Sequence, residues 1–109
     1  MKRISARQFL VEVRELIKSR SHWCKGAWAK TSKGNGVQAD DPDACRWCLG
    51  GAMQYVCGQH PILDSIKAYD KVRSVIKHSG IACFNDSHTH KEVIEVLDTA
   101  INSLTRRKK

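Results

Sequence analysis

The chain has 109 residues, of which 41% are hydrophobic and 28% are charged, a balance typical of a single folded domain with one modest core. This composition excludes wholesale disorder, and no apolar run approaches the ~18 residues that a membrane-spanning helix requires. The formal net charge of +8 favours attraction to nucleic acid or to an acidic protein surface, and does not choose between them.

The first residues resemble the start of a secretion signal, but no apolar stretch follows them, because charged residues interrupt the sequence from Ile4 to Arg20. We therefore expect no secretion signal and a cytoplasmic location. The five cysteines are then expected to remain free thiols, since an odd number in a reducing compartment does not indicate a disulfide scaffold.

The first predicted helix runs from Ile4 or Ser5 to Ser19, and Ser5 with Gln8 forms a capping-box pattern at its start. Apolar side chains recur at helical spacing along one face, namely Phe9, Leu10, Val13, Leu16 and Ile17. A second stripe is basic and consists of Arg3, Arg7, Arg14 and Lys18. We expect the first stripe to be buried and the second to face outward.

A segment rich in tryptophan and glycine follows. Residues 33–36 read Lys-Gly-Asn-Gly, the strongest turn signal in the chain. The flanking residues 27–31 and 37–39 are predicted to pair as a short hairpin, or to form an ordered loop. Because an isolated hairpin is marginal in water, we expect it to lie against the helices through Trp23 and Trp28.

A second helix is predicted from Asp41, a suitable N-cap followed by Pro42, to Gly58. It would carry Cys45, Trp47, Cys48, Leu49, Ala52, Met53 and Val56. Gly50 and Gly51 would each cost about 1 kcal/mol relative to alanine inside this helix. The pair therefore indicates a kink or the close approach of another segment, expected to be the Trp23 loop or residues 81–85.

The third predicted helix runs from about Pro61 to His78, with Gly80 in the position that follows a helix end. Its apolar stripe is Ile62, Ile66, Tyr69, Val72 and Ile76. Residues 81–84 are apolar but too few for a predicted helix, and residues 85–88 are predicted to form a turn. Thr89 and Glu92 then form a capping box that starts a fourth helix, with Val93, Leu97, Ala100, Ile101 and Leu104 on one face.

The expected fold is mainly α. It is a compact four-helix domain over residues 1–105, with a small β-hairpin or ordered loop between the first two helices. Residues 106–109, which are all basic, are expected to form a C-terminal tail.

Several motifs in order resemble a family of small, uncharacterised proteins from bacteria and their phages, whose members share W-C-L-x-G-A and W-N-D-x-x-x-T segments. The matching residues are Trp23-x2-Gly26-Ala27, Trp47-Cys48-Leu49-x-Gly51-Ala52, Ile81-Ala82-x-Phe84-Asn85-Asp86 and Thr89 leading into Glu92-Val93. Phe84 stands where the family usually has tryptophan. The resemblance covers most of the chain and implies a compact, mainly helical domain. It implies no activity, and suggests a phage or mobile-element origin by analogy only.

The cysteines and histidines suggest a metal-binding site as one hypothesis. Cys45-x2-Cys48 has the spacing of a zinc-binding pair, and Cys57-x2-His60 follows it. Cys45 and Cys48 also fall on the core-facing stripe of the predicted second helix, where a free cysteine acts as a small hydrophobe. We favour the core reading, and expect neither a metal nor another cofactor.

The same residue types allow a nucleophilic reading, in which Cys24 or Cys83 pairs with a histidine among His22, His88 and His90. Asn85 or Asp86 would orient the imidazole. No local signature of a known cysteine enzyme is present, and Asn85-Asp86 also fits a turn before the last helix. We assign no catalytic residue, and expect structural roles for Trp23, Trp47, Cys48, Gly51, Asn85 and Asp86.

The preferred functional prediction is a small, basic, non-enzymatic interaction protein. It would bind an acidic host protein, for example as an inhibitor, through a basic face and a tryptophan-bearing loop, because tryptophan and arginine dominate binding hot spots. The expected contact residues are Trp28, Lys25, Lys30, Lys33, Arg7, Arg14 and Lys18. The alternatives are a nucleic-acid-binding accessory protein, in which these cations contact phosphates and Trp28 stacks on a base, and a small Cys/His enzyme or zinc protein.

Overall fold

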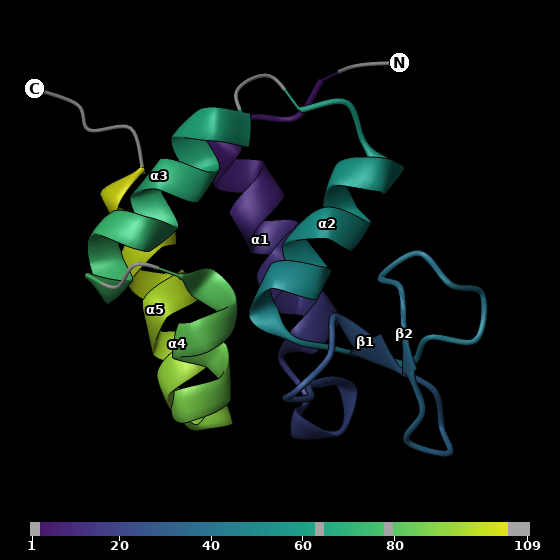
Figure 1. The fold of residues 1–109 in the computed structure, drawn as a ribbon. Helices are drawn as coiled ribbons and strands as arrows, with labels where there is room; N and C mark the ends of the chain where they lie inside the picture. Colours follow the sequence, from purple (N-terminus) through teal and green to yellow (C-terminus); the bar gives the residue numbers. More distant parts are fainter. Residues whose placement is uncertain (1–2, 63–64, 78–79, 105–109) are drawn as a thin grey trace, which may run out of the picture.

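The computed structural model describes residues 3–62, 65–77 and 80–104. The described chain is mainly helical, which confirms the predicted class (Figure 1). It contains five α-helices rather than the expected four, namely α1 Ala6–Ile17, α2 Leu49–Gln59, α3 Ser65–Ile76, α4 Ile81–Ser87 and α5 His90–Ser103. A short 3-10 helix, η1 Arg20–His22, follows α1. The predicted basic tail, residues 106–109, lies outside the described residues.

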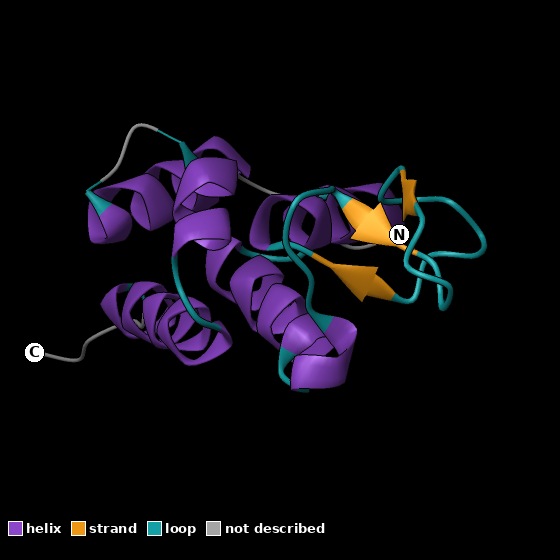
Figure 2. Cartoon of the chain, turned by 60° about the horizontal axis from the view of Figure 1, so that its bottom comes forward, coloured by secondary structure: helices purple, strands orange, loops and turns teal. Residues whose placement is uncertain are grey.

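The hairpin between the first two helices is part of a small antiparallel sheet. Strand β1 (Ala29–Lys30) lies between β2 (Gly36–Val37) and β3 (Arg46–Trp47). Ala29 is the partner of both Val37 and Trp47. Figure 2 shows the three strands together at one end of the molecule, beside the helices. The predicted hairpin is therefore present in a shorter form, and β3 was not expected.

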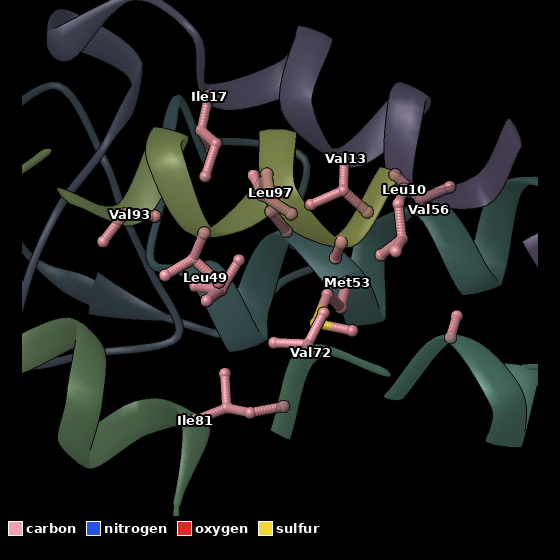
Figure 3. Packing of buried hydrophobic residues seen from close by; sticks show 14 of the residues in the cluster. Leu10, Val13, Ile17, Leu49, Met53, Val56, Val72, Ile81, Val93 and Leu97 are labelled. Carbon is pink, nitrogen blue, oxygen red and sulfur yellow. The ribbon is translucent and has the colours of Figure 1, made fainter. Parts of the chain in front are cut away.

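The apolar faces of the helices meet in one core. Helix α1 contacts α2, α3 and α5, so it lies at the centre of the helical layer. Figure 3 shows the buried side chains between these helices. Those labelled with no exposed surface include Leu10, Val13, Leu49, Met53, Val72 and Leu97, and Phe9 of α1 is equally buried. The 3.6-residue spacing of these side chains dictates which face of each helix packs inward.

The predicted capping box is complete at the start of α5, whereas only its Ser5 half is present at the start of α1, where the Gln8 amide donates to Glu12 instead. The Ser5 hydroxyl accepts a hydrogen bond of 3.0 Å from the Gln8 N–H at the start of α1. At the start of α5, the Thr89 hydroxyl accepts from the Glu92 N–H, and the Glu92 carboxylate accepts from the Thr89 N–H. Both capping groups satisfy backbone donors that the first turn of a helix leaves free.

The second helix begins later than predicted. Cys48, not Asp41, is the N-cap of α2, so Cys45, Trp47 and Cys48 do not lie on a helix. Asp41 instead caps a turn, because its carboxylate accepts from the Asp43 N–H at 2.8 Å. The sequence Asp-Pro-Asp is compatible with both a turn and a helix start. A turn forms here because the residues that follow it pair with strand β1. The backbone N–H of Cys45 donates to the Lys30 carbonyl at 2.9 Å.

The third helix also begins later, at Ser65 rather than Pro61. Ile62 instead forms a parallel bridge with Ile4, next to a hydrogen bond from the Ile4 N–H to the Pro61 carbonyl. The predicted end at His78 lies outside the described residues. The left-handed position after α3 is Lys77, with φ 53°. Gly80, expected in that position, is the extended N-cap of α4.

Residues 81–87 form helix α4, which corrects both the short apolar run and the turn predicted there. Its buried side chains are Ile81, Phe84 and Asn85, spaced three and four residues apart. A helix of seven residues is too short for its periodicity to stand out in the sequence. Contacts with α2 and α3 stabilise it in place.

Candidate binding site beside Trp28

Asn85 joins three separate segments of the chain. Its side-chain oxygen accepts hydrogen bonds from the Trp23 indole N–H at 2.7 Å and from the Leu49 backbone N–H at 3.0 Å. Its amide nitrogen donates to the Cys24 carbonyl at 3.1 Å and to the Asp86 carboxylate at 3.2 Å. The side chain has no exposed surface, and both of its polar atoms have two partners. A buried amide satisfied in this way fixes α4 relative to α2 and to the loop after η1.

Asp86 continues this network toward the surface. Its Oδ1 atom also accepts from the Gly26 backbone N–H at 3.0 Å. Gly26 has φ +82°, a conformation that glycine adopts without a steric cost. Asp86 therefore fixes the turn that leads from Trp23 to Trp28. The other carboxylate oxygen, Oδ2, forms no hydrogen bond with the described part of the chain.

The N-terminus of α2 passes directly beneath Trp28. A Cβ atom on Gly51 would lie 1.9 Å from the Trp28 carbonyl oxygen, and one on Gly50 would lie 2.8 Å from the Cζ3 atom of the indole. The glycine pair is therefore required by close approach of another segment, one of the two readings left open by the sequence. The approaching residue is Trp28, which stays 45% exposed.

Cys48 and Cys24 are buried beside this contact. Cys48 caps α2, and its sulfur accepts a hydrogen bond from the Gly51 N–H at 3.2 Å. Burial raises the pKa of the Cys48 thiol. Burial, with a smaller contribution from Cys48, raises the pKa of Cys24 to about 11, although Lys30 and Arg46 lower it. Both thiols therefore keep their protons at neutral pH, and neither is an activated nucleophile.

A pocket of about 590 Å³ lies between the loop, strand β2 and helix α4. We call it the Trp28 pocket. Its volume falls in the range of small-molecule sites. The wall includes Ala27, Trp28, Val37, Gln38, Ala82 and Asp86. Among the described residues that line the pocket, Asp86 is the only one with a formal charge.

The open end of the sheet carries two cations side by side. Lys30 on β1 is the direct partner of Arg46 on β3, and both are half-buried. Ala29 and Trp47, their neighbours, are buried on the opposite face. We call Lys30 and Arg46 the cationic sheet face. Within the described ranges, neither forms an ion pair with an acidic residue, and the Arg46 Nε–H donates to the Ser21 carbonyl at 3.2 Å.

Trp28 directly precedes strand β1, which carries Lys30. Its carbonyl accepts from the Cys48 N–H at 3.1 Å, which continues the pairing of β1 with β3 by one step. The Trp28 ring itself lies against Gly50 of α2. Lys25 and Lys33 are exposed on the flanking turns, and the Lys25 ammonium lies 5.7 Å from the centre of the Trp23 ring. Arg46 was not among the predicted contacts, because its segment was read as helix.

The basic stripe of α1 is partly neutralised within the chain. The Arg14 guanidinium pairs with Asp98 on α5 at 2.5 Å, and Lys18 pairs with Glu15 at 2.9 Å. Arg7 is exposed on the same helix. The sheet face therefore offers more uncompensated positive charge to a partner than Arg14 and Lys18 do.

The four metal candidates do not form a site. Cys45 precedes β3, Cys48 caps α2, and His60 follows the same helix. Burial raises the pKa of the Cys57 thiol and raises that of Tyr69 to about 12. Over residues 3–62, 65–77 and 80–104, no three His, Cys, Asp or Glu side chains lie close enough to hold a metal ion.

The histidines proposed as general bases have structural partners. His88 Nδ1 lies 2.9 Å from the Phe84 carbonyl, and its ring stacks on Phe84. His90 Nε2 lies 2.8 Å from the Ile17 carbonyl. No described histidine is hydrogen-bonded to a described cysteine, so the structure gives no support to the nucleophilic alternative, for which no catalytic residue was assigned.

Comparison with known proteins gives a family without an assigned activity. The model of a family of unknown function, DUF6197, matches residues 1–103, so the chain belongs to that family. No curated protein and no solved structure matches the chain. No described helix is both long and apolar enough to cross a membrane.

Proposed function

We propose that this member of a family of unknown function is a non-enzymatic binding protein for an acidic partner protein. The contact surface is the cationic sheet face together with Trp28. The observation that carries the proposal is the direct cross-strand pairing of Lys30 with Arg46. Like charges in this position destabilise a sheet, and an anionic group placed between them removes the repulsion.

The surrounding charge supports an anionic partner. No acidic residue occurs between Glu15 and Asp40, whereas this stretch contains Lys18, Arg20, Lys25, Lys30 and Lys33. A field of one sign attracts an oppositely charged surface and increases the rate of encounter. Arg46 retains guanidinium N–H groups beyond the one bound to Ser21, and these suit bidentate contact with a carboxylate.

Trp28 supplies the apolar part of the surface. It is one of two large hydrophobic residues that are strongly exposed in the described chain, with 45% of its surface accessible. Tryptophan beside arginine is the composition of an interface hot spot. The backbone of Trp28 is fixed by contact with α2, so the ring is presented with little loss of conformational entropy on binding.

A second candidate is binding of nucleic acid, which the exposed indole beside two cations also favours. Phosphates would replace carboxylates at Lys30 and Arg46, and a base would stack on Trp28. The two candidates differ in salt dependence. Nucleic-acid binding releases condensed counterions, so its affinity falls steeply as the salt concentration rises.

The enzyme alternative has less support, since burial keeps Cys24 and Cys48 protonated. A phage or mobile-element association, an inhibitory role and a cytoplasmic location stay predictions.

The test uses a paired substitution, Lys30→Gln with Arg46→Gln, and a control pair, Lys71→Gln with Lys91→Gln, on α3 and α5. Both pairs remove two positive charges. Binding of fluorescent polyglutamate and of a single-stranded oligonucleotide is titrated at several salt concentrations. Host lysate is then passed over each immobilised variant, with and without nuclease, and the retained proteins are identified by mass spectrometry.

We expect the wild type and the control pair to bind polyglutamate and to retain the same acidic protein. The Lys30/Arg46 pair should bind polyglutamate at least about tenfold more weakly, since two charge-assisted contacts are lost. Retention that disappears with nuclease, and tighter binding to the oligonucleotide with a steep salt slope, would favour the second candidate. Equal binding by both variant pairs would contradict the proposed surface.

A further inference from the structure

We propose that the Trp28 pocket binds the ammonium or guanidinium head of an organic cation, between the Trp28 indole and the Asp86 carboxylate. This site shares Trp28 with the proposed contact surface, but its charged group is Asp86 rather than Lys30 and Arg46. It takes a ligand of opposite charge, and it does not depend on that function being correct.

The charge of the pocket selects a cation. Asp86 is the only formally charged side chain among its described lining residues, although the whole chain carries a net charge of +8. An anionic ligand would meet an uncompensated carboxylate there. The remaining wall, which includes Ala27, Val37 and Ala82, is apolar and suits the hydrocarbon part of an amine.

The Asp86 carboxylate is already positioned to accept a hydrogen bond from a ligand. Its Oδ1 atom is fixed by the N–H of Gly26 and by the amide of Asn85. Asn85 is buried and is in turn hydrogen-bonded to Trp23, Leu49 and Cys24, so the carboxylate is attached to a buried polar network. Oδ2 forms no bond within the described chain and remains available to a donor. A preorganised acceptor loses little entropy when a ligand binds.

The indole supplies the second contact. Trp28 lines the pocket and is 45% exposed, while its Cζ3 edge rests against Gly50. Of the aromatic side chains, tryptophan attracts a cation to its face most strongly. Because a carboxylate and an aromatic ring line the same pocket, a positively charged head group should bind more tightly than a neutral head group of the same shape.

The test compares butylguanidinium with butylurea, its neutral counterpart of nearly the same shape, and follows the three indole N–H signals by NMR. Trp23 and Trp47 donate to Asn85 and to the Ala39 carbonyl, whereas the Trp28 indole N–H has no described acceptor. A Trp28→Phe variant identifies its signal. The expected result is a saturable shift of the Trp28 signal with butylguanidinium, and at least about tenfold weaker binding of butylurea.

Two variants and a control test the residues. Asp86→Asn keeps an acceptor for Gly26 and Asn85 but removes the charge, and should weaken butylguanidinium binding at least about tenfold. Trp28→Leu keeps the carboxylate but lacks the Trp28 signal, so its binding is followed by the backbone N–H signal of Gly26, which donates to Asp86. This variant should bind butylguanidinium about threefold to thirtyfold more weakly. Asp70→Asn on α3 makes the same change of charge outside the pocket and should leave binding unchanged. An unchanged Asn85-bound Trp23 signal reports that each variant is folded.

The source of the cation is distinguished by a capped Gly-Arg-Gly peptide and by butylammonium. Tighter binding of the peptide assigns the pocket to a basic side chain of a polypeptide, and tighter binding of the free alkyl cations assigns it to a small amine. Equal affinity for butylurea and butylguanidinium, equal affinity in the Asp86→Asn variant, or no shift with any cation would overturn the proposal. The Lys30/Arg46 pair should retain butylguanidinium binding, and Asp86→Asn should retain polyglutamate binding, so the two proposals fail separately.

Discussion

The carbonyl oxygen of Trp28 occupies the space that a side chain on Gly51 would need, with 1.9 Å between that oxygen and the nearest possible Cβ. The adjacent Gly50 meets only the edge of the Trp28 ring, at 2.8 Å. At Gly51 the opposing group is the Trp28 backbone carbonyl, which is hydrogen-bonded to the Cys48 N–H. At Gly50 the opposing group is the Trp28 ring, a side chain that can shift. The two glycines therefore have different tolerance to substitution.

Gly51→Ala should destabilise the protein by about 3 kcal/mol, because either strand β1 or helix α2 must move to relieve the overlap. Gly50→Ala should cost less, about 1 kcal/mol, since the gain in helix propensity partly offsets the shift of the ring. Urea unfolding of both variants measures the difference. Equal stability of the two alanine variants would show that the backbone contact is not rigid.

Asn85→Ala should be among the most destabilising polar substitutions, by about 3 to 4 kcal/mol, because several partners are left buried without a hydrogen bond. The Trp23 indole N–H signal should move toward its solvent-exposed position at the same time. Asn102→Ala, an exposed change on α5, serves as the control and should alter stability by less than about 0.5 kcal/mol. A mild effect at Asn85 would mean that water replaces the lost bonds.

Lys30→Glu should stabilise the domain by about 0.5 kcal/mol, because it converts a like-charge cross-strand pair with Arg46 into an attractive one. The same variant should lose polyglutamate binding. Thermal unfolding and the fluorescence titration measure the two effects in one preparation. Lys71→Glu, in the middle of α3, is the matched control and should change neither strongly. A loss of stability in Lys30→Glu would indicate that the two side chains do not repel each other.

Cysteine alkylation at neutral pH should proceed first at exposed Cys83 and last at Cys24 and Cys48. Raising a thiol pKa from 9.0 to about 11 lowers the thiolate fraction near neutral pH by about 100-fold, before any steric protection is counted. Peptide mapping after iodoacetamide treatment gives the order, and a denatured sample should label all five sites. Rapid labelling of Cys24 or Cys48 in the folded protein would revive the nucleophile interpretation.

Stability should fall in alkaline solution. Burial raises the pKa of Cys24 from 9.0 to about 11 and that of Tyr69 from 10.0 to about 12, so both groups ionise first in the unfolded chain. Their contribution is complete below pH 9 and is lost as the pH rises toward 12. Urea unfolding across this range should show a smaller decline for Cys24→Ala than for the wild type. Cys83→Ala, the control, should decline as the wild type does.

Much of the helical framework was readable from the sequence. The caps at Ser5 and Thr89 and the apolar stripes of α1 and α5 are local signals, in which each residue acts on neighbours three or four positions away. The turn between β1 and β2 is also a local signal, although it closes between Thr31 and Asn35 rather than over residues 33–36, because Gly36 belongs to β2. The glycine pair at 50–51 predicted either a kink or a close approach, and the sequence did not decide between them or show which atoms approach.

Only the tertiary structure determined the rest. The pattern at Asp41 suits a turn or a helix start, and pairing of residues 45–48 with β1 chose the turn. Helix α4 is too short to be recognised by periodicity, and contacts with α2 and α3 maintain it. Asn85 reaches Trp23 across 62 residues and Leu49 across 36. The pocket and the Lys30–Arg46 pair arise from such long-range contacts, whose partners a local pattern cannot specify.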